Sequence, residues 1–258
     1  MIGCARITKW AVVCCFTAIA FSTCAGPINT NTPAKWSGTV SAGFTATRGN
    51  SKTTLATFVA SLDRKTGKNE LLLGANATYG NAQVIVNGVK TDSTTAQNAE
   101  AFGQYNRFLF TDRFYLFGRV DGYHDDLASI HYRVTTSLGP GYYFIKTTNT
   151  DLSAEAGPGF ISESVGDEEE NFPTLRAAQK FHQKLSDRAR IWESAEITPD
   201  LGNFSNYIIN AEVGIAADLT AKKTFELQCF LDDSYNSKPA PGKVNNDLKL
   251  VVAIGYKF

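Results

Sequence analysis

LKLVVAIGYKF, at residues 248–258, alternates strictly between two kinds of side chain. Every second position from Leu248 onward is large and apolar, and the positions between are lysine, valine, alanine or glycine. Successive side chains of a β-strand point to opposite faces, so this period of two predicts a strand. The apolar face ends on Tyr256 and Phe258, and outer-membrane barrels use a terminal aromatic residue of this kind as an assembly signal. A strand in a soluble sheet would show the same alternation. The N-terminal residues are therefore needed to predict in which compartment the protein folds.

Residues 1–25 read as a signal peptide. Arg6 and Lys9 give the segment a positive start without any acidic residue, and the apolar region that follows is too short to span a bilayer as a helix. Two cleavage sites of the small-x-small type fit, at 18–20 and 23–25, and we favour the second. The segment therefore predicts export.

Cysteine usage and charge agree with an exported barrel. Four of the five cysteines lie in the predicted signal peptide, which leaves Cys229 in the mature chain. Cys24 keeps a lipoprotein open as an alternative, although the residues before it match a lipobox poorly. Small secreted proteins usually rely on disulfides, and a closed hydrogen-bonded barrel in lipid has no need of them. Removing Arg6 and Lys9 from the 25 basic residues leaves 23 against 25 acidic ones, a net charge of −2 that gives no reason to expect a nucleic-acid partner.

Segments with a period of two, rich in Gly, Thr, Phe and Tyr, recur along the mature chain without any long helical pattern. Many exceed the roughly 5–6 residues of globular strands and match the roughly 9–11 tilted residues that cross a membrane. The sequence therefore predicts an all-β fold, a single closed antiparallel meander barrel over 35–258 preceded by a short periplasmic segment at 26–34. The twelve predicted strands are 35–47, 52–64, 69–80, 94–110, 113–124, 130–146, 149–163, 172–185, 188–199, 204–219, 222–236 and 244–258.

The connections between these strands favour an outer-membrane topology, in which short turns are periplasmic and longer loops external. With a periplasmic N-terminus, the external side would carry the links 81–93, 125–129, 164–171, 200–203 and 237–243, with the short 48–51 as an exception. The periplasmic side would carry the tight polar links near 66–68, 111–112, 147–148, 186–187 and 221.

The alternation also assigns residues to the two faces of the barrel. The residues expected to contact lipid are Val40, Phe44, Leu73, Val134, Leu138, Val213, Ile215, Val252 and Ile254. The charged residues expected to face the lumen are Arg119, Asp121, Arg133, Glu155, Arg176, Lys180, Glu212, Asp218, Glu226 and Lys249. Aromatic residues crowd both faces between 108 and 117, and we interpret part of this cluster as an interfacial girdle rather than the core of a soluble sandwich.

Several motifs, in order along the mature chain from Trp36 to Phe258, resemble a known family, that of the salt-induced outer membrane proteins, otherwise described as domain of unknown function 481. The resemblance implies a barrel in the bacterial outer membrane and supplies no established activity or catalytic residue. The motifs that carry it are Trp36-x-Gly38, Thr47-x-Gly49-Asn50-Ser51, Asp112–Arg119, Leu138–Tyr142, Glu155–Gly159, Leu185-Ser186-Asp187, Glu212-x-Gly214, Ser237–Gly242, Asn246-Asp247 and Gly255–Phe258.

Nothing in the sequence indicates an enzyme or a cofactor. No phosphate-binding glycine loop, CxxC or HExxH motif is present. His131 and Ser137 would share a face but lie roughly 20 Å apart along one strand, too far for proton transfer. His124 with its neighbouring aspartates, and the acidic run 167–170, could bind a cation, but hydrated loops are the simpler interpretation, and we assign no metal site.

The mixed signs of the lumen charges favour an interior occupied by paired side chains. Twelve strands lie between the roughly eight whose interior fills with side chains and the 16–18 that leave an aqueous channel. By turn position, Glu155 lies closer in register to Lys180 than to Arg133 or Arg176, and we expect a Glu155–Lys180 pair. The interpretation we favour is a structural or stress-adaptive envelope protein, and the alternative is a narrow, weakly selective channel for small solutes. Expected partners are outer-membrane lipid, lipopolysaccharide and the barrel-assembly machinery.

Overall fold

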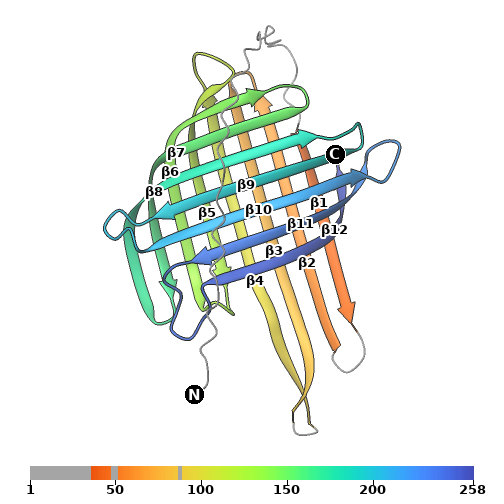
Figure 1. Cartoon of the computed structure of the whole chain (residues 1–258), viewed down its shortest axis with the longest axis vertical. Coiled ribbons are helices and arrows are strands. Elements are labelled where there is room, and N and C mark those ends of the chain that lie inside the picture. Colours follow the sequence, from red (N-terminus) through yellow and green to blue (C-terminus); the bar gives the residue numbers. More distant parts are fainter. Residues whose placement is uncertain (1–35, 48–51, 87–88) are drawn as a thin grey trace, which may run out of the picture. The chain divides into compact units, whose positions relative to one another are not determined.

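The computed structural model describes residues 36–47, 52–86 and 89–258, so the predicted signal peptide, the 26–34 segment and the 48–51 link lie outside the described residues. The described residues form one closed antiparallel barrel in which each strand pairs with its neighbours in the chain (Figure 1). The predicted all-β meander barrel is thus confirmed. Its strands are β1 (Trp36–Thr47), β2 (Lys52–Thr66), β3 (Asn69–Val86), β4 (Val89–Phe108), β5 (Phe114–Asp125), β6 (Ile130–Lys146), β7 (Thr150–Val165), β8 (Glu168–Lys184), β9 (Ala189–Pro199), β10 (Tyr207–Asp218), β11 (Phe225–Asn236) and β12 (Asn246–Lys257).

The barrel closes between its first and last strands, as the sequence predicts. Val40 lies opposite Tyr256 in an antiparallel ladder between β1 and β12. Gly38 and Phe258 exchange two backbone hydrogen bonds, each with an N···O distance of 3.1 Å. In hydrocarbon, an open sheet edge would leave its backbone N–H and C=O groups without hydrogen-bond partners. The closed ladder satisfies these groups, as a membrane-spanning sheet requires.

Two predicted loops are wrong, because the strands continue through them. Most of 81–93 belongs to β3 and β4, which form a hairpin that extends beyond β5, since the ladder between β4 and β5 begins only at Asn98. This hairpin projects at the lower end of the barrel in Figure 1. The acidic residues predicted as a loop at 164–171 lie mostly in β8, which is joined to β7 by a tight turn with Gly166 at a φ of 61°. Polar and acidic residues have low strand propensity, and ladder pairing overrides it here.

The wall follows the expected alternation between its two faces. Phe44, Leu138 and Ile254 are exposed on the outside, whereas Arg133 and Glu155 are buried inside. Within the part of the chain that the structure describes, no helix is long and apolar enough to span a membrane.

Aromatic pairs mark both ends of the outer surface. Phe225 and Tyr256 pack edge to face at one end with ring centroids 5.5 Å apart, and Tyr207 and Tyr235 stack at the other with centroids 5.8 Å apart. The cluster between 108 and 117 divides by face. Phe110 is exposed on the outside, whereas the other face packs inside the barrel with Phe108, Tyr115 and Phe117.

The barrel interior as candidate functional site

Glu155 is the centre of a polar network inside the barrel. It lies on β7 and is 4% exposed. Arg176 Nη1 donates to its Oε2 at 2.8 Å, and Gln104 Nε2 donates to its Oε1 at 2.7 Å. Tyr115 Oη donates to the same Oε1 at 3.0 Å, and Lys180 Nζ lies 3.5 Å from it. One carboxylate therefore joins side chains from four strands, β4, β5, β7 and β8.

A glycine makes the reach of Tyr115 possible. Tyr115 stands on β5 and must cross β6 to contact β7, and its ring passes directly over Gly141 of β6. A Cβ atom at Gly141 would clash with the ring carbons and the hydroxyl of Tyr115. Only glycine leaves this space free for the ring. Gly141, in the Leu138–Tyr142 motif, therefore allows Tyr115 to lie across β6 inside the barrel.

Arg176 holds the far side of this network. Its side chain is 1% exposed, and besides Glu155 it bonds Glu196 of β9, with Nε and Oε2 2.8 Å apart. The guanidinium also lies over the ring of Phe117, 5.2 Å from its centroid, in a cation–π contact. Two carboxylates and an aromatic face neutralise the charge of this buried arginine, so it can be a permanent part of the interior.

The end of the interior next to the turn between β4 and β5 is filled by an aromatic cluster with two lysines. The rings of Phe108 and Tyr115 lie 5.3 Å apart and Tyr143 packs against both. Lys65 Nζ lies 4.7 Å from the centroid of Phe108, and Lys146 Nζ lies 4.6 Å from it. The lysine stems add apolar bulk, and Lys146 Nζ donates to the carbonyl oxygen of Asp112.

A second network lies on the adjoining strands β9 to β12. Glu226 of β11 is fully buried and is held by both outer nitrogens of Arg190, a fork that suits a carboxylate. Lys257 Nζ lies 3.3 Å from Glu226 and also bonds Asp218. Four charged side chains from β9, β10, β11 and β12 thus neutralise one another at the level of the terminal residues.

Apolar packing fills part of the interior beside this second network. Trp192 of β9 lies over Gly214 of β10, where a Cβ atom would clash with the indole. The same indole donates from Nε1 to Glu212 and packs near Phe230, with centroids 6.3 Å apart. Phe230 joins Val251 in a small buried apolar cluster that Val59 of β2 completes.

Toward the other end of the barrel, ion pairs again connect neighbouring or facing strands. Arg133 pairs directly with Glu163, the residue opposite it in the ladder between β6 and β7. Lys249 Nζ lies 3.2 Å from Asp232 and 3.5 Å from Asn98 Oδ1, which is on β4. The contact with Asn98 crosses the interior, because β1, β2 and β3 separate β12 from β4 along the wall.

The structure places every lumen charge named from the sequence on the inner face, but it changes their pairing. Lys180 does contact Glu155, yet the residue opposite Glu155 is Ala178 and not Lys180. Arg176, which the register argument disfavoured, is closer to the carboxylate than Lys180 is. The centre of the turn between β7 and β8 lies one position before the predicted one because β8 begins earlier, which moves the residue opposite Glu155 by two positions. Long side chains reach diagonally across this offset.

Sequence reasoning missed several members of the two networks. Neutral residues were not sought, although the parity of their strands places Gln104 and Tyr115 on the inner face. The charged residues missed include Glu163, Glu196, Arg190 and Lys257. For Glu163 a signal existed, since the predicted turn put a residue near 162 opposite Arg133.

The residues considered for catalysis or metal binding do not converge. His131 is exposed whereas Ser137 is buried, so the expected shared face is wrong, and a register irregularity between Ile130 and Tyr132 explains it. His124 Nε2 lies 3.2 Å from Asp126 at an exposed site. Among the residues that the structure describes, no three His, Cys, Asp or Glu side chains gather where they could hold a metal ion.

The acidic run at 167–170 has a partner on a neighbouring loop. Lys238 Nζ donates to Glu170 at 2.8 Å, and this hydrogen bond raises the pKa of Lys238 above its ordinary value. The pair tethers the loop 237–245 to the start of β8.

Comparisons with known proteins agree with this architecture. The chain matches, over residues 40–258, a family described as a protein of unknown function, DUF481. No curated protein matches it. Among solved structures, the NanC porin aligns with a TM-score of 0.51 at 7% identity, covering 86% of this chain and 100% of that one. An outer membrane channel from Pseudomonas putida F1 aligns with a TM-score of 0.49 at 11% identity over 86% and 94% of the two chains. The translocator domain of the autotransporter NalP from Neisseria meningitidis gives 0.47 at 17% identity over 88% and 90%. At such identities the likeness to the NanC porin is one of fold alone.

Proposed function

The chain belongs to the DUF481 family of proteins of unknown function, and from this premise we propose that it is a bacterial outer-membrane barrel whose interior is filled by its own side chains. In this proposal it acts as a structural or stress-adaptive component of the cell envelope. It carries out no reaction and binds no cofactor or nucleic acid.

The observation that carries the proposal is the set of contacts across the interior. Gln104 bonds Glu155 at 2.7 Å although β5 and β6 lie between their strands, and it accepts a hydrogen bond from Lys180 at 3.2 Å. Lys249 approaches Asn98 from the other side. Buried ion pairs and aromatic rings occupy further parts of the inner face, and an open pore would need these groups to be hydrated instead.

A membrane location is supported by the outer surface. Exposed Leu, Val, Ile and Phe side chains form a band around the barrel between aromatic pairs, which is the surface that a bilayer requires. The proposed route is export through the signal peptide at 1–25 and insertion by the barrel-assembly machinery, followed by contact with outer-membrane lipid and lipopolysaccharide. Membrane fractionation with a heat-modifiability gel tests this location, and recovery in the soluble periplasmic fraction would contradict it.

A narrow, weakly selective channel is the second candidate, because some inner charges remain accessible to water. The side chain of Lys180 is 38% exposed, and those of Lys249 and Arg190 are each 28% exposed. These groups lie in the same networks that fill the interior, so any path past them would be constricted and lined by both signs of charge.

Conductance in planar bilayers separates the two candidates. We expect the natural protein to give very small currents or none, and the double substitution Tyr115→Ala with Gln104→Ala to raise them by removing side chains that cross the interior. Leu138→Ala, on the outer face, is the matched control and should leave the currents unchanged. Large currents with a strong preference for one sign of ion in the natural protein would overturn the occupied interior.

A role in salt stress is the finer part of the proposal, suggested by the family resemblance. Its test is a comparison of protein abundance and of growth of a deletion strain at low and high salt. An abundance and a growth rate that do not respond to salt would remove this part and leave the barrel itself unaffected.

A further inference from the structure

The outer face of the barrel carries a carboxylate where the surrounding surface is apolar. Glu193 on β9 points outward, because its neighbour Trp192 points inward to Glu212. It is exposed, and Gln179 on β8 donates to its Oε1 at 3.2 Å from the same outer face. Directly beside it in the ladder lies Val213, itself 51% exposed.

The depth of Glu193 follows from the register. Val213 on β10 lies midway between Tyr207, at the external aromatic pair, and Leu219, whose amide bonds the carbonyl of Phe225 in the periplasmic pair. Glu193 pairs with Val213, so its carboxylate lies near the middle of the apolar band. An acidic side chain that faces hydrocarbon at this depth destabilises a barrel unless it finds polar partners.

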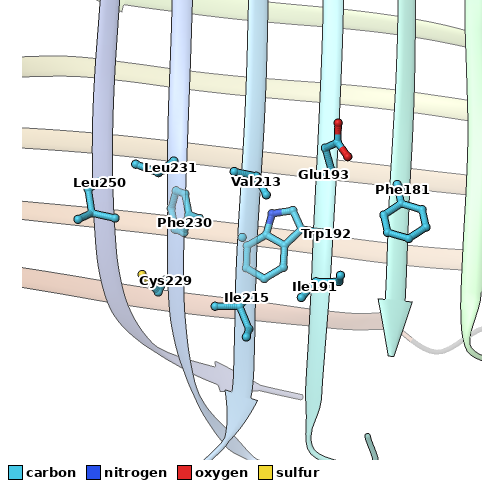
Figure 2. Close-up of a pocket in the computed structure, with 11 residues that line it drawn as sticks. Phe181, Ile191, Trp192, Glu193, Val213, Ile215, Cys229, Phe230, Leu231 and Leu250 are labelled. Atoms are coloured by element: carbon cyan, nitrogen blue, oxygen red, sulfur yellow. The ribbon is translucent and has the colours of Figure 1, made fainter. Parts of the chain in front are cut away.

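A shallow hollow of about 350 Å³ opens beside the carboxylate. Figure 2 shows Glu193 on its strand with apolar side chains on the strands to either side. The outward-facing residues that line the hollow with it are Phe181, Ile191, Val213, Ile215, Cys229, Leu231 and Leu250.

We propose that this face, centred on β9, is the interface of a homodimer, in which the Gln179–Glu193 pair of one copy meets the same pair of a second copy. The inference rests on the proposed membrane location. In the dimer the two carboxylates and two amides form one ring of hydrogen bonds that the hydrocarbon cannot reach.

Hydrogen-bonding capacity identifies the occupant as a second copy of the chain. A lipid tail could fill the hollow but offers no donor to Glu193, whereas the Gln179 side chain has two N–H groups and uses one of them within its own copy. Donor and acceptor therefore lie on one patch. A two-fold interface requires a self-complementary patch. Here each copy would donate an N–H group of Gln179 to the Glu193 carboxylate of the other.

The hollow fits the same symmetry. A two-fold axis along the membrane normal near β9 places β8 of one copy against β10 and β11 of the other. Phe181, next to Glu193 on β8, then lies over the partner's hollow at the level of Val213 and Leu231. Small residues at Ala195 and Ala211 beside the axis allow the walls to approach closely.

Crosslinking in intact membranes tests the proposal. The Ala195→Cys substitution is made in a Cys229→Ser background and treated with a bismaleimide whose spacer is about 10 Å, the separation of two sheets packed face to face. We expect a crosslinked dimer. Ala75→Cys in the same background, exposed on the opposite wall, is the matched control and should stay monomeric. Equal crosslinking at both positions, or none at Ala195→Cys, would overturn the interface.

Polar-group variants supply a second readout. Glu193→Leu should abolish the crosslinked dimer, whereas Glu193→Gln should retain it because an amide can still accept and donate. Size-exclusion chromatography with light scattering, in detergent and in nanodiscs, measures the mass of the natural protein, and a monomer in both would overturn the proposal. So would a lipid that copurifies with a monomer. Fractionation of the same samples reports membrane location separately, so a failed interface is distinguishable from a failed location.

Discussion

At the scale of single residues, the interior depends on a carboxylate that neutralises buried cations. Glu155 and Arg176 are 4% and 1% exposed, so the pair is shielded from bulk solvent. Removing one member of a buried pair leaves the other charge uncompensated, which costs more than the net value of the pair itself. Glu196 offsets part of this cost for Arg176, and Asn106 Oδ1 offers Gln104 a second acceptor at 2.9 Å.

Glu155→Ala should therefore lower the free energy of unfolding by about 3 kcal/mol, the size found for broken buried pairs. Urea denaturation in detergent, followed by tryptophan fluorescence, measures it. Glu155→Gln should lose less because it still accepts hydrogen bonds, and Glu168→Gln, exposed at the start of β8, should change little. Equal stability of Glu155→Ala and the natural protein would show that the network is not formed.

Gly141→Ala tests whether the ring of Tyr115 needs the space above Gly141. The added methyl group would occupy the space of the ring, so we expect a loss of roughly 1–3 kcal/mol, typical of an overpacked interior. Gly118→Ala, where a Cβ atom meets nothing within 4 Å, is the matched control. Combining Gly141→Ala with Tyr115→Leu should recover much of the loss, and an absence of recovery would place the strain elsewhere.

At the scale of strands, the two faces of the wall should tolerate charge very differently. Val213→Arg faces the middle of the apolar band and should cost roughly 2–4 kcal/mol. Thr135→Arg faces inward opposite Asp121 in the ladder between β5 and β6 and should be tolerated better. Denaturant titration of both variants in lipid bilayers makes the comparison, and equal costs would count against a membrane-spanning wall.

The strands also show how far the sequence could predict the fold. Alternation located all the strands because each has one apolar face, and it oriented Arg133 and Glu155 correctly. It ended β3 too early and started β4 too late, because consecutive apolar residues at 84–86 and polar residues around them break the period of two. It predicted the Glu155–Lys180 contact, which forms at 3.5 Å, but placed the two residues opposite each other in the ladder. A shift of one residue in the centre of a turn moves every cross-strand neighbour by two while leaving the faces unchanged.

The interior network could be predicted only in part, because some of its contacts cross the closed barrel between strands that are not neighbours. The contacts of Gln104 with Glu155 and Lys180 join strands that are not neighbours in the ladder. Their distance depends on the diameter and tilt of the whole barrel, which no local pattern records. The alternation of the sequence identifies which residues point inward. The diameter and tilt of the closed barrel determine which of these residues come into contact.

At the scale of the whole molecule, the closing ladder should control assembly. Deleting Phe258 removes two backbone hydrogen bonds to Gly38 and the terminal aromatic residue together. We expect a lower yield of folded protein in the outer membrane, measured by a heat-modifiability gel of membrane fractions. Phe204→Ala, an exposed aromatic residue in the link between β9 and β10, should leave the yield unchanged. A normal yield after deletion would show that insertion reads another signal.

The hydrogen bonds between Gly38 and Phe258 have a consequence for where the chain begins. Because they bring the start of β1 beside the end of β12, the barrel is a ring in which no strand is structurally first. A circular permutant, with a short linker across that junction and new termini at the Gly166 turn, would retain every rung of the ladder. In the permutant the free carboxyl end would no longer lie at Phe258. We therefore expect the order of the strands along the chain to matter for insertion into the membrane and to have little effect on the stability of the folded barrel.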